Sequence, residues 1–298
     1  MKLNDLNVVF AGCARDCEPF ISETLKNLDL YSSNFAKCYK IIVENGSKDK
    51  TREILKKKQK HGDFFLFRDD FNNFPYRGHR LERARNLIIQ TIKENSQLSS
   101  CDLFIMVDLD KTGTFRISDS HIKDSIEFLF LNKNTAGVFA NQLGTYYDMW
   151  TLRDEKYCNN DFWVEVLQHL TKNKNFTENI SEENLLDVKK KIIEKKTYSF
   201  DKNLAPIPVK SAFGGFGIYK MSYVLKNKKE YEGDQIIDLI SKDKKKIKVK
   251  FQKCEHVNFN LGLIEQNGKL YILPNLINRA FSEFSFSPSS ALQLIIKD

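Results

Sequence analysis

Residues 102–110 read DLFIMVDLD, an apolar run that ends in two carboxylates one residue apart, Asp108 and Asp110. A short, almost continuous apolar segment is typical of a strand buried in a parallel sheet. Two carboxylates at the end of such a strand can hold a divalent cation that bridges the oxygens of a diphosphate. The alternative is a pair that caps a helix or a turn, because the Asp-x-Asp spacing also recurs by chance.

Strands and helices alternate on both sides of this run. Apolar segments that predict strands are separated by amphipathic segments that predict helices. This alternation favours an α/β fold with a mostly parallel central sheet, flanked by helices and joined by right-handed crossovers. The predicted strands are Leu6–Ala11, Tyr39–Glu44, Asp63–Phe67, Asp102–Val107 and Thr135–Asn141, and the predicted helices are Glu18–Leu28, Asp49–Gln59, Leu81–Glu94 and Ser118–Leu131.

The remainder of the chain is less regular. It contains a glycine-rich segment, Phe213–Tyr219, that leads into a short strand. No repeat or linker interrupts the chain, which predicts a single domain over residues 1–298, with 1–115 as a nucleotide-binding half and 116–298 as an acceptor and catalytic half. The predicted elements of the second half are helices at Asp161–Leu170, Glu182–Glu194 and Glu255–Glu265, and strands at Lys248–Gln252 and Leu270–Leu273.

The formal net charge is +8, from 47 Lys and Arg against 39 Asp and Glu. The excess gathers in two lysine-rich stretches, Lys189–Lys196 and Lys242–Lys250. Each stretch is either a solvated surface or a contact for an anionic membrane or an anionic acceptor. No nucleic-acid-binding motif accompanies them, so no nucleic-acid partner is expected.

The cysteines and the apolar runs indicate a cytoplasmic protein. The six cysteines include no C-x-x-C pair, which disfavours a zinc site and favours reduced, mostly buried thiols. No apolar run is long enough to span a membrane, and the first residues lack the pattern of a signal peptide. We therefore expect a cytoplasmic location with at most peripheral membrane contact.

Both common phosphate cradles are missing. No G-x-G-x-x-G follows the first predicted strand, and no P-loop pattern occurs. Ligands of parallel α/β sheets bind at the carboxyl ends of the strands, where Asp108 and Asp110 are expected. A diphosphate held through a metal fits this combination.

Four segments follow one another in the order VVFAGCARDCEPFI, IIVENGSKDKTREIL, RLERARNLII and FIMVDLD. This order resembles that of GT-A glycosyltransferases, and the later CEHVNFNLGLIEQNGKLYILPNLIN is similar to the acid motif of that family. Through YYDMWTLR, FGGFGIYK and CEHV, the chain is most similar to the capsule-associated mannosyltransferase type. The resemblance spans Leu6 to Asn278 and implies a GT-A, Rossmann-like fold.

The resemblance also implies roles for individual residues. It implies a UDP- or GDP-linked sugar as donor, Mn²⁺ or Mg²⁺ as cofactor, and Glu255 as catalytic base. If Glu255 is not the catalytic residue, we expect the substitute acid to be Asp234 or Glu232, in a predicted turn at Tyr231–Asp234. Asp49 either matches the loop acid of the family or caps its own helix. The implied donor contacts are Ala11, Arg15, Glu44, Arg85, Asn86 and Asp108, the implied metal ligands are Asp110 and His256, and the candidate acceptor contacts are Tyr147, Asp148 and Trp150.

The function expected from these features is a metal-dependent glycosyltransferase of the hexosyltransferase type. It would act on a glycan or lipid-linked acceptor in surface polysaccharide synthesis. One alternative is a sugar nucleotidyltransferase, which the short turn Gly12–Arg15 with its single glycine disfavours. Another is a basic protein without catalysis that binds nucleic acid or a membrane surface. The aromatic residues Trp150 and Trp163 fit either a sugar-stacking site or a protein core, and the core is the more frequent location of aromatic side chains.

Overall fold

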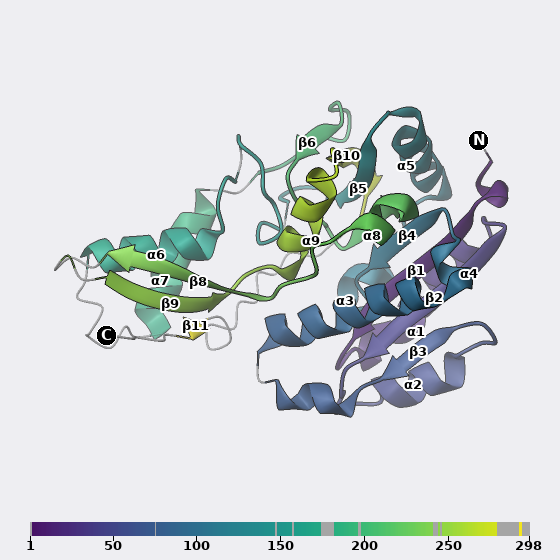
Figure 1. Cartoon of the computed structure of the whole chain (residues 1–298), viewed down its shortest axis with the longest axis horizontal. Coiled ribbons are helices and arrows are strands. Elements are labelled where there is room, and N and C mark those ends of the chain that lie inside the picture. Colours follow the sequence, from purple (N-terminus) through teal and green to yellow (C-terminus); the bar gives the residue numbers. More distant parts are fainter. Residues whose placement is uncertain are drawn as a thin grey trace.

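The computed structural model describes residues 2–74, 76–146, 148–156, 158–173, 182–195, 198–240, 244, 246–278 and 292–293. Its centre is an eight-stranded sheet with the strand order β3-β2-β1-β4-β7-β5-β10-β6 (Figure 1). These strands are β1 Asn7–Ala14, β2 Lys37–Glu44, β3 Phe64–Phe67, β4 Leu103–Val107, β5 Thr135–Asn141, β6 Ile207–Val209, β7 Phe216–Lys220 and β10 Lys269–Ile277.

The sheet is mostly parallel, as predicted. Strands β3, β2, β1 and β4 pair with one another in parallel, in that order, and β5 pairs in parallel with β10. Strand β7 lies between β4 and β5 and is antiparallel to both, and β6 is antiparallel to β10 at the edge. Because β7 is reversed, its amino end meets the carboxyl ends of β4 and β5, which brings the glycine-rich segment to the edge where Asp108 and Asp110 lie.

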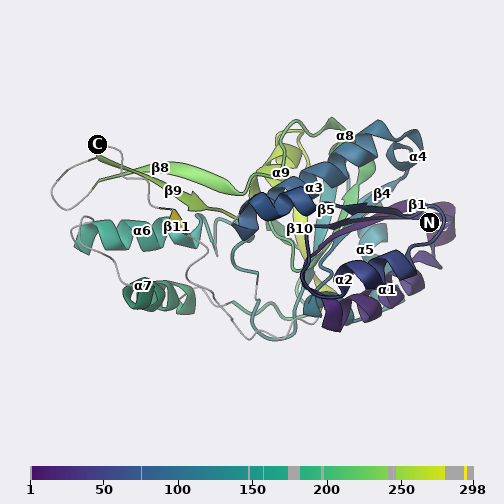
Figure 2. The ribbon, with the colours of Figure 1, turned by 90° about the horizontal axis from the view of Figure 1, so that it is seen from below.

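Helices cover both faces of the sheet (Figure 2). One face packs Ala84, Ile88 and Phe259 of α3 and α9, and the other packs Ile21 and Ile122 of α1 and α5, in two separate apolar clusters. Helices on the first face are α3 Arg77–Glu94, α4 Ser96–Ser99, α8 Met221–Lys226 and α9 Glu255–Ile264, and those on the second are α1 Glu18–Ser32, α2 Thr51–Lys58 and α5 Asp119–Leu131. Short 3₁₀ turns are η1 Leu3–Asp5, η2 Asp69–Asn73 and η3 Lys111–Thr114.

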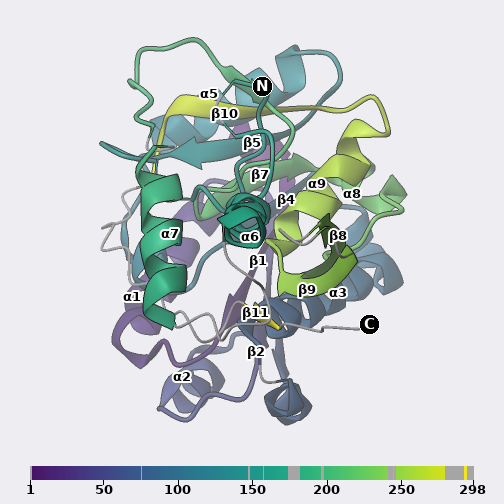
Figure 3. The same ribbon diagram turned by 90° about the vertical axis from the view of Figure 1, so that its left-hand side faces the viewer.

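A second, three-stranded sheet forms an arm at the end of the molecule away from the N-terminus (Figure 1). The arm consists of β8 Asp234–Ile240, β9 Lys246–Gln252, β11 Leu292–Gln293, α6 Phe162–Asn173 and α7 Glu182–Glu194. Helix α6 lies between α7 and the β8–β9 hairpin (Figure 3). Trp163, which is 1% exposed, is part of the arm's own apolar cluster, so it is a core residue and does not face a sugar.

Several boundaries differ from the predicted ones. Strand β1 continues to Ala14 because Gly12 to Ala14 stay paired with β2, and β10 passes through Pro274 at an irregularity in its pairing. Helix α3 begins at Arg77, four residues before the predicted start at Leu81. Ser118 caps α5 as predicted, because its hydroxyl accepts a hydrogen bond from the His121 amide. Among the described residues, none of the helices combines the length and the apolar character that crossing a bilayer requires.

Candidate functional site

Three carboxylates meet at the carboxyl edge of the large sheet. Asp108 and Asp110 follow β4, and Asp148 comes from the segment after β5. The Asp108 amide donates a hydrogen bond of 2.9 Å to the Gly215 carbonyl, and the Gly214 amide donates one of 2.9 Å to Asp148 Oδ2. The loop before β7 therefore joins Asp108 to Asp148.

This loop depends on glycine. Gly214 has a φ of +64°, and a Cβ at this position would lie 2.4 Å from the Ala140 carbonyl oxygen of β5. Any larger residue would push the loop away from the sheet. The close approach keeps the Gly214 amide aimed at the Asp148 carboxylate.

The negative charges at this edge, together with burial, raise the pKa values of the carboxyl groups. Burial raises the pKa of the Asp108 carboxyl to about 7, the negative charges of Asp110 and Asp148 add to this, and Arg85 opposes it. Burial likewise raises the pKa of Asp148, against hydrogen bonds from Thr151 and Gly214. About a quarter of the Asp108 side chain, 26%, still reaches solvent. The edge therefore presents carboxylates that favour a proton or a cation.

Arg85 of α3 connects this cluster to Glu255, the first residue of α9. One guanidinium nitrogen lies 3.5 Å from Asp108 Oδ1, and another forms an ion pair with Glu255 Oε1. The side chains of Arg85 and Glu255 are only 5% and 2% exposed. The rings of Phe213 and Tyr231 lie on either side, 5.5 and 6.0 Å from the guanidinium carbon. Glu255, the predicted base, is thus buried against Arg85.

His256 lies behind the cluster. Its ring stacks on Phe213 at a centroid distance of 4.1 Å and is 2% exposed, and neither ring nitrogen has a hydrogen-bond partner among the described residues. Burial and the neighbouring charge of Arg85 lower the pKa of His256 well below its ordinary value, so the ring is neutral. Within the described ranges no three His, Cys, Asp or Glu side chains gather as metal ligands. Asp108, Asp110 and Asp148 therefore lie near one another without forming a complete set of metal ligands on their own.

A rim of arginines borders the carboxylates. The arginines are Arg15, Arg77 and Arg80: burial lowers the pKa of Arg80, and the like charges of Arg15 and Arg77 lower it further. The charge of Arg77 also acts on Asp108. Sequence reasoning named Arg15 and missed Arg80, although Arg77 and Arg80 share one helix face through their i, i+3 spacing. The rim gives the site a cationic side suited to phosphate oxygens.

Two predicted donor contacts lie elsewhere. Ala11 is inside β1, paired with Ile41 and Met106, and its side chain, 1% exposed, is part of the apolar core, so the structure does not place it beside the carboxylates. The reason is that β1 runs three residues further than predicted. Glu44 is fully buried, and its two oxygens accept hydrogen bonds from the Ser47 amide at 2.5 Å and Arg52 Nε at 2.6 Å. Glu44 thus stabilises the loop between β2 and α2.

Asp49 is a helix cap. Its two oxygens accept hydrogen bonds of 2.9 Å from the backbone amides of Glu18 and Thr51. These amides belong to the first turns of α1 and α2, where backbone donors have no partner within the helix. The capping alternative therefore describes Asp49, and the side chain secures the two loops that follow β1 and β2.

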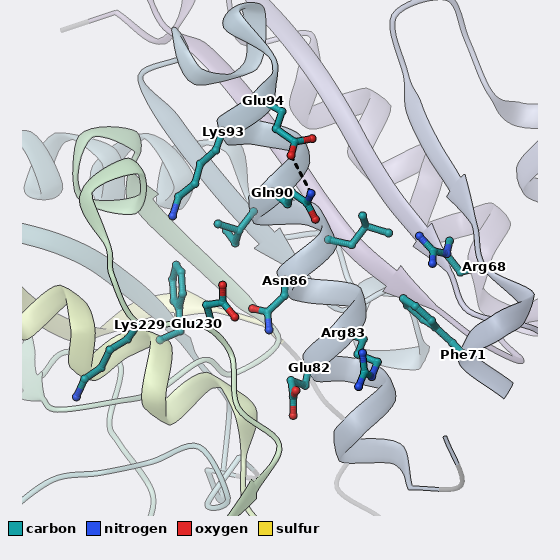
Figure 4. Close-up of a pocket in the computed structure, with 13 residues that line it drawn as sticks. Arg68, Phe71, Glu82, Arg83, Asn86, Gln90, Lys93, Glu94, Lys229 and Glu230 are labelled. Atoms are coloured by element: carbon teal, nitrogen blue, oxygen red, sulfur yellow. Dashed lines mark hydrogen bonds between the residues drawn. The ribbon is translucent and has the colours of Figure 1, made fainter. Parts of the chain in front are cut away.

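Asn86 faces away from the carboxylates. It exchanges two hydrogen bonds of 2.9 Å with the backbone of Tyr231. It lines a cavity of about 550 Å³ on the outer side of α3 (Figure 4). Other lining residues are Glu82, Arg83, Lys93, Lys229 and Glu230. Asp108, Asp110, Asp148 and Glu255 do not line this cavity, so the structure does not bring Asn86 to the predicted diphosphate site.

Asp234, the substitute acid, lies at the start of β8 and not in a turn. Its carboxylate is 3.0 Å from His79 Nε2 and forms an ion pair with Lys250. Although burial opposes it, the hydrogen bonds from Lys250 and His79 lower the pKa of Asp234. The residue connects α3 to the arm.

The candidate acceptor residues divide. Asp148 belongs to the carboxylate cluster, as described above. Trp150 is half-buried against the apolar cluster of the arm, and its indole nitrogen has no hydrogen-bond partner within the part of the chain that the structure describes. Tyr147 lies outside the described residues.

Comparisons with known proteins find likeness only among solved structures. No family model matches the chain, and no curated protein matches it by sequence. A mannosyltransferase from Pyrobaculum calidifontis in complex with GDP-Man and Mn²⁺ is 11% identical with a TM-score of 0.41, over 76% of this chain and 48% of its own. S. aureus TarS 1–349 in complex with UDP-GlcNAc is 13% identical with a TM-score of 0.49, over 97% of this chain and 62% of its own.

A third such structure is glucosyl-3-phosphoglycerate synthase from Mycobacterium tuberculosis in complex with Mn²⁺, UDP and glucosyl-3-phosphoglycerate. It is 11% identical with a TM-score of 0.38, over 88% of this chain and 65% of its own. The match thus covers less than two thirds of the length of each of these three proteins. Similarity at this level carries no argument about function, so the site must be interpreted from its own geometry.

Proposed function

We propose that the chain is a metal-dependent glycosyltransferase of the hexosyltransferase type. It transfers a sugar from a UDP- or GDP-linked donor to a glycan or lipid-linked acceptor, and we place it in the cytoplasm, in surface polysaccharide synthesis. The observation that supports this most is the meeting of Asp108, Asp110 and Asp148 at the carboxyl edge of the sheet, beside the arginine rim. Carboxylates and arginines together suit a cation and a diphosphate at once.

The carboxylates fit a divalent cation that also takes oxygens from its substrate. Asp110 Oδ1 accepts a hydrogen bond of 2.9 Å from the Thr112 amide, which leaves Oδ2 for a metal. Mg²⁺ and Mn²⁺ are commonly held by one or two carboxylates together with phosphate oxygens. Asp110 and Asp108 would hold such an ion, which neutralises charge on the departing diphosphate. We do not assign His256 as a metal ligand, because its ring is buried and stacked on Phe213.

The other charged residues divide between donor and acceptor. Arg15, Arg77 and Arg80 bind the diphosphate oxygens of the donor. Asp148 meets the acceptor hydroxyl and accepts its proton, because its raised pKa makes it a better base than an ordinary aspartate. Glu255 acts through Arg85: it fixes the guanidinium that reaches Asp108.

Thermal unfolding with UDP or GDP, with and without Mn²⁺, tests this proposal. We expect a stabilisation that needs both nucleoside diphosphate and metal, because only their complex fills the site. Asp110→Asn should lose this stabilisation and retain the fold, since an asparagine oxygen can still accept from Thr112. The control is Asp124→Asn, an exposed position on α5. Metal-dependent stabilisation that survives in Asp110→Asn would contradict the assignment of Asp110. Hydrolysis of a set of UDP- and GDP-sugars then identifies the donor.

A further inference from the structure

The outer face of the β8–β9 hairpin combines exposed isoleucines with lysines. In the register of the two strands, Ile236 lies opposite Lys250, Asp238 opposite Lys248, and Ile240 opposite Lys246. Side chains on one face of a strand alternate with those on the other, so these residues share one face. Ile236 and Ile240 are 62% and 65% exposed, and Lys246 and Lys248 are exposed as well.

The opposite face of the hairpin already has a partner. Leu239, Ile247 and Val249 are buried in the apolar cluster of the arm, together with residues of α6. The isoleucines on the outer face therefore add nothing to that core. Two large aliphatic side chains exposed to water on one strand raise the free energy of the folded chain, and burying them against a binding partner would lower it.

We propose that this outer face, made by Ile236, Asp238, Ile240, Lys246 and Lys248, docks on the surface of an anionic lipid bilayer. Isoleucine side chains insert among the upper acyl groups, while lysines extend to the lipid phosphates. Lys244, which lies between the two strands, is exposed as well. Lys250 contributes less, because it forms an ion pair with Asp234.

Charge complementarity favours a bilayer over the other occupants. A second copy of the chain, packed through the same face, would bring two sets of lysines together. A polyanion such as nucleic acid would use the lysines and leave the isoleucines in water. An anionic bilayer satisfies both kinds of side chain. This inference concerns the arm alone and does not depend on the glycosyltransferase proposal.

Vesicle flotation with the full chain tests the proposal. We expect the protein to float with vesicles of phosphatidylcholine mixed with phosphatidylglycerol, and not with phosphatidylcholine alone. Each lysine near an anionic surface contributes about fivefold to partitioning, and burial of each isoleucine contributes about tenfold. High salt should weaken binding by screening the lysines and leave the isoleucine part.

Two variants and a matched control separate the contributions. Ile236→Thr/Ile240→Thr removes the apolar part while keeping residues that favour strands, and Lys246→Gln/Lys248→Gln removes charge. The control Leu131→Gln/Lys133→Gln removes the exposed last leucine of α5 and an exposed lysine that follows the helix. Both hairpin variants should lose at least tenfold in partitioning, with unchanged thermal unfolding, and the control should bind as the parent does.

Three results would overturn the proposal. The first is equal flotation of the hairpin variants and the parent, which would place the contact elsewhere. The second is absence of flotation by the parent on anionic vesicles. The third is a dimer in solution that the isoleucine variant dissociates, which would show that the face joins two copies.

Discussion

Asp108 shows how a single carboxylate can work against the stability of the fold that holds it. Its pKa in the folded chain is about 7, above its ordinary value of 3.8, because it is buried beside Asp110 and Asp148. The folded state therefore binds its proton more tightly than the unfolded state does. The resulting stability is present below about pH 4 and is lost as the pH rises towards 7.

Asp108→Asn should consequently stabilise the protein without ligand at pH 8, by on the order of 1 kcal/mol. The gain should disappear near pH 4, where the wild-type carboxyl is protonated. Urea unfolding at both pH values measures it, with Asp124→Asn as an exposed control. A variant that is less stable than the parent at pH 8 would mean that the attraction of Arg85 dominates instead.

Glu255 is a second residue whose role stability can reveal. Glu255→Gln leaves the buried Arg85 charge with Asp108 as its nearest acid, and removing one partner of a buried ion pair costs about 3–5 kcal/mol. We expect a loss of this order in urea unfolding, together with lower turnover. Replacing both residues, as in Arg85→Leu/Glu255→Leu, should recover much of the stability but none of the turnover. If Glu255→Gln unfolds like the parent, Glu255 is free to act as the base that the sequence predicted.

At the scale of elements, α7 carries a charge into the core of the arm. Lys189 is 4% exposed, and its ammonium group lies 4.3 Å from the Trp163 ring centroid. Burial lowers the pKa of Lys189 to about 8, against the opposing charge of Asp161. Because the unfolded chain binds this proton more tightly, the ammonium costs stability at neutral pH, and stability recovers as the pH rises from about 8 towards 10.5.

Lys189→Met should therefore stabilise the chain by about 1–2 kcal/mol at pH 7, after the lost contact with Trp163 is deducted. The gain should shrink at pH 10, where the wild-type amine is largely neutral. The neighbouring exposed Lys190→Met serves as control, since its side chain is 76% exposed. An equal gain at both pH values would attribute the effect to packing and not to charge.

The elements that sequence predicted best are those whose signal is local. The apolar runs of β1, β2, β4 and β5 and the periodicity of α3 and α5 indicate their own structure. The reversed direction of β7 depends on its pairing with β4 and β5, which lie far from it in the sequence, so no local pattern contains it. The site divides in the same way. Asp108 and Asp110 could be found at the end of one strand, whereas the ion pair of Arg85 with Glu255 needs α3 and α9 to pack together.

At the scale of the whole molecule, the two predicted halves of the chain share one sheet. Strand β4, at the end of residues 1–115, pairs with β1 on one side and with β7 on the other. All five residues of β4 are buried. Separating the halves would leave an apolar central strand with an open edge.

We therefore expect residues 1–115, produced alone, to lack cooperative urea unfolding and to aggregate. The full chain is the control, and co-expression with residues 116–298 should restore a folded complex because β7 then covers β4. Circular dichroism and size-exclusion chromatography distinguish these outcomes. A monomeric fragment that unfolds cooperatively would show that the first half is a domain in its own right.

Helix α3 ties the arm to the site through two glycines. A Cβ on Gly233 would lie 2.5 Å from the Gly78 carbonyl oxygen, and hydrogen bonds from the Gly78 amide to Gln252 and from the Gly233 amide to Glu82 secure the contact. Arg85 follows Gly78 on the same rigid helix, about 10 Å further along its axis. A displacement of the arm would therefore move α3, and with it Arg85. A larger side chain at position 78 or 233 would push α3 away from the arm. Such a substitution would then also shift the guanidinium of Arg85, which neither glycine touches.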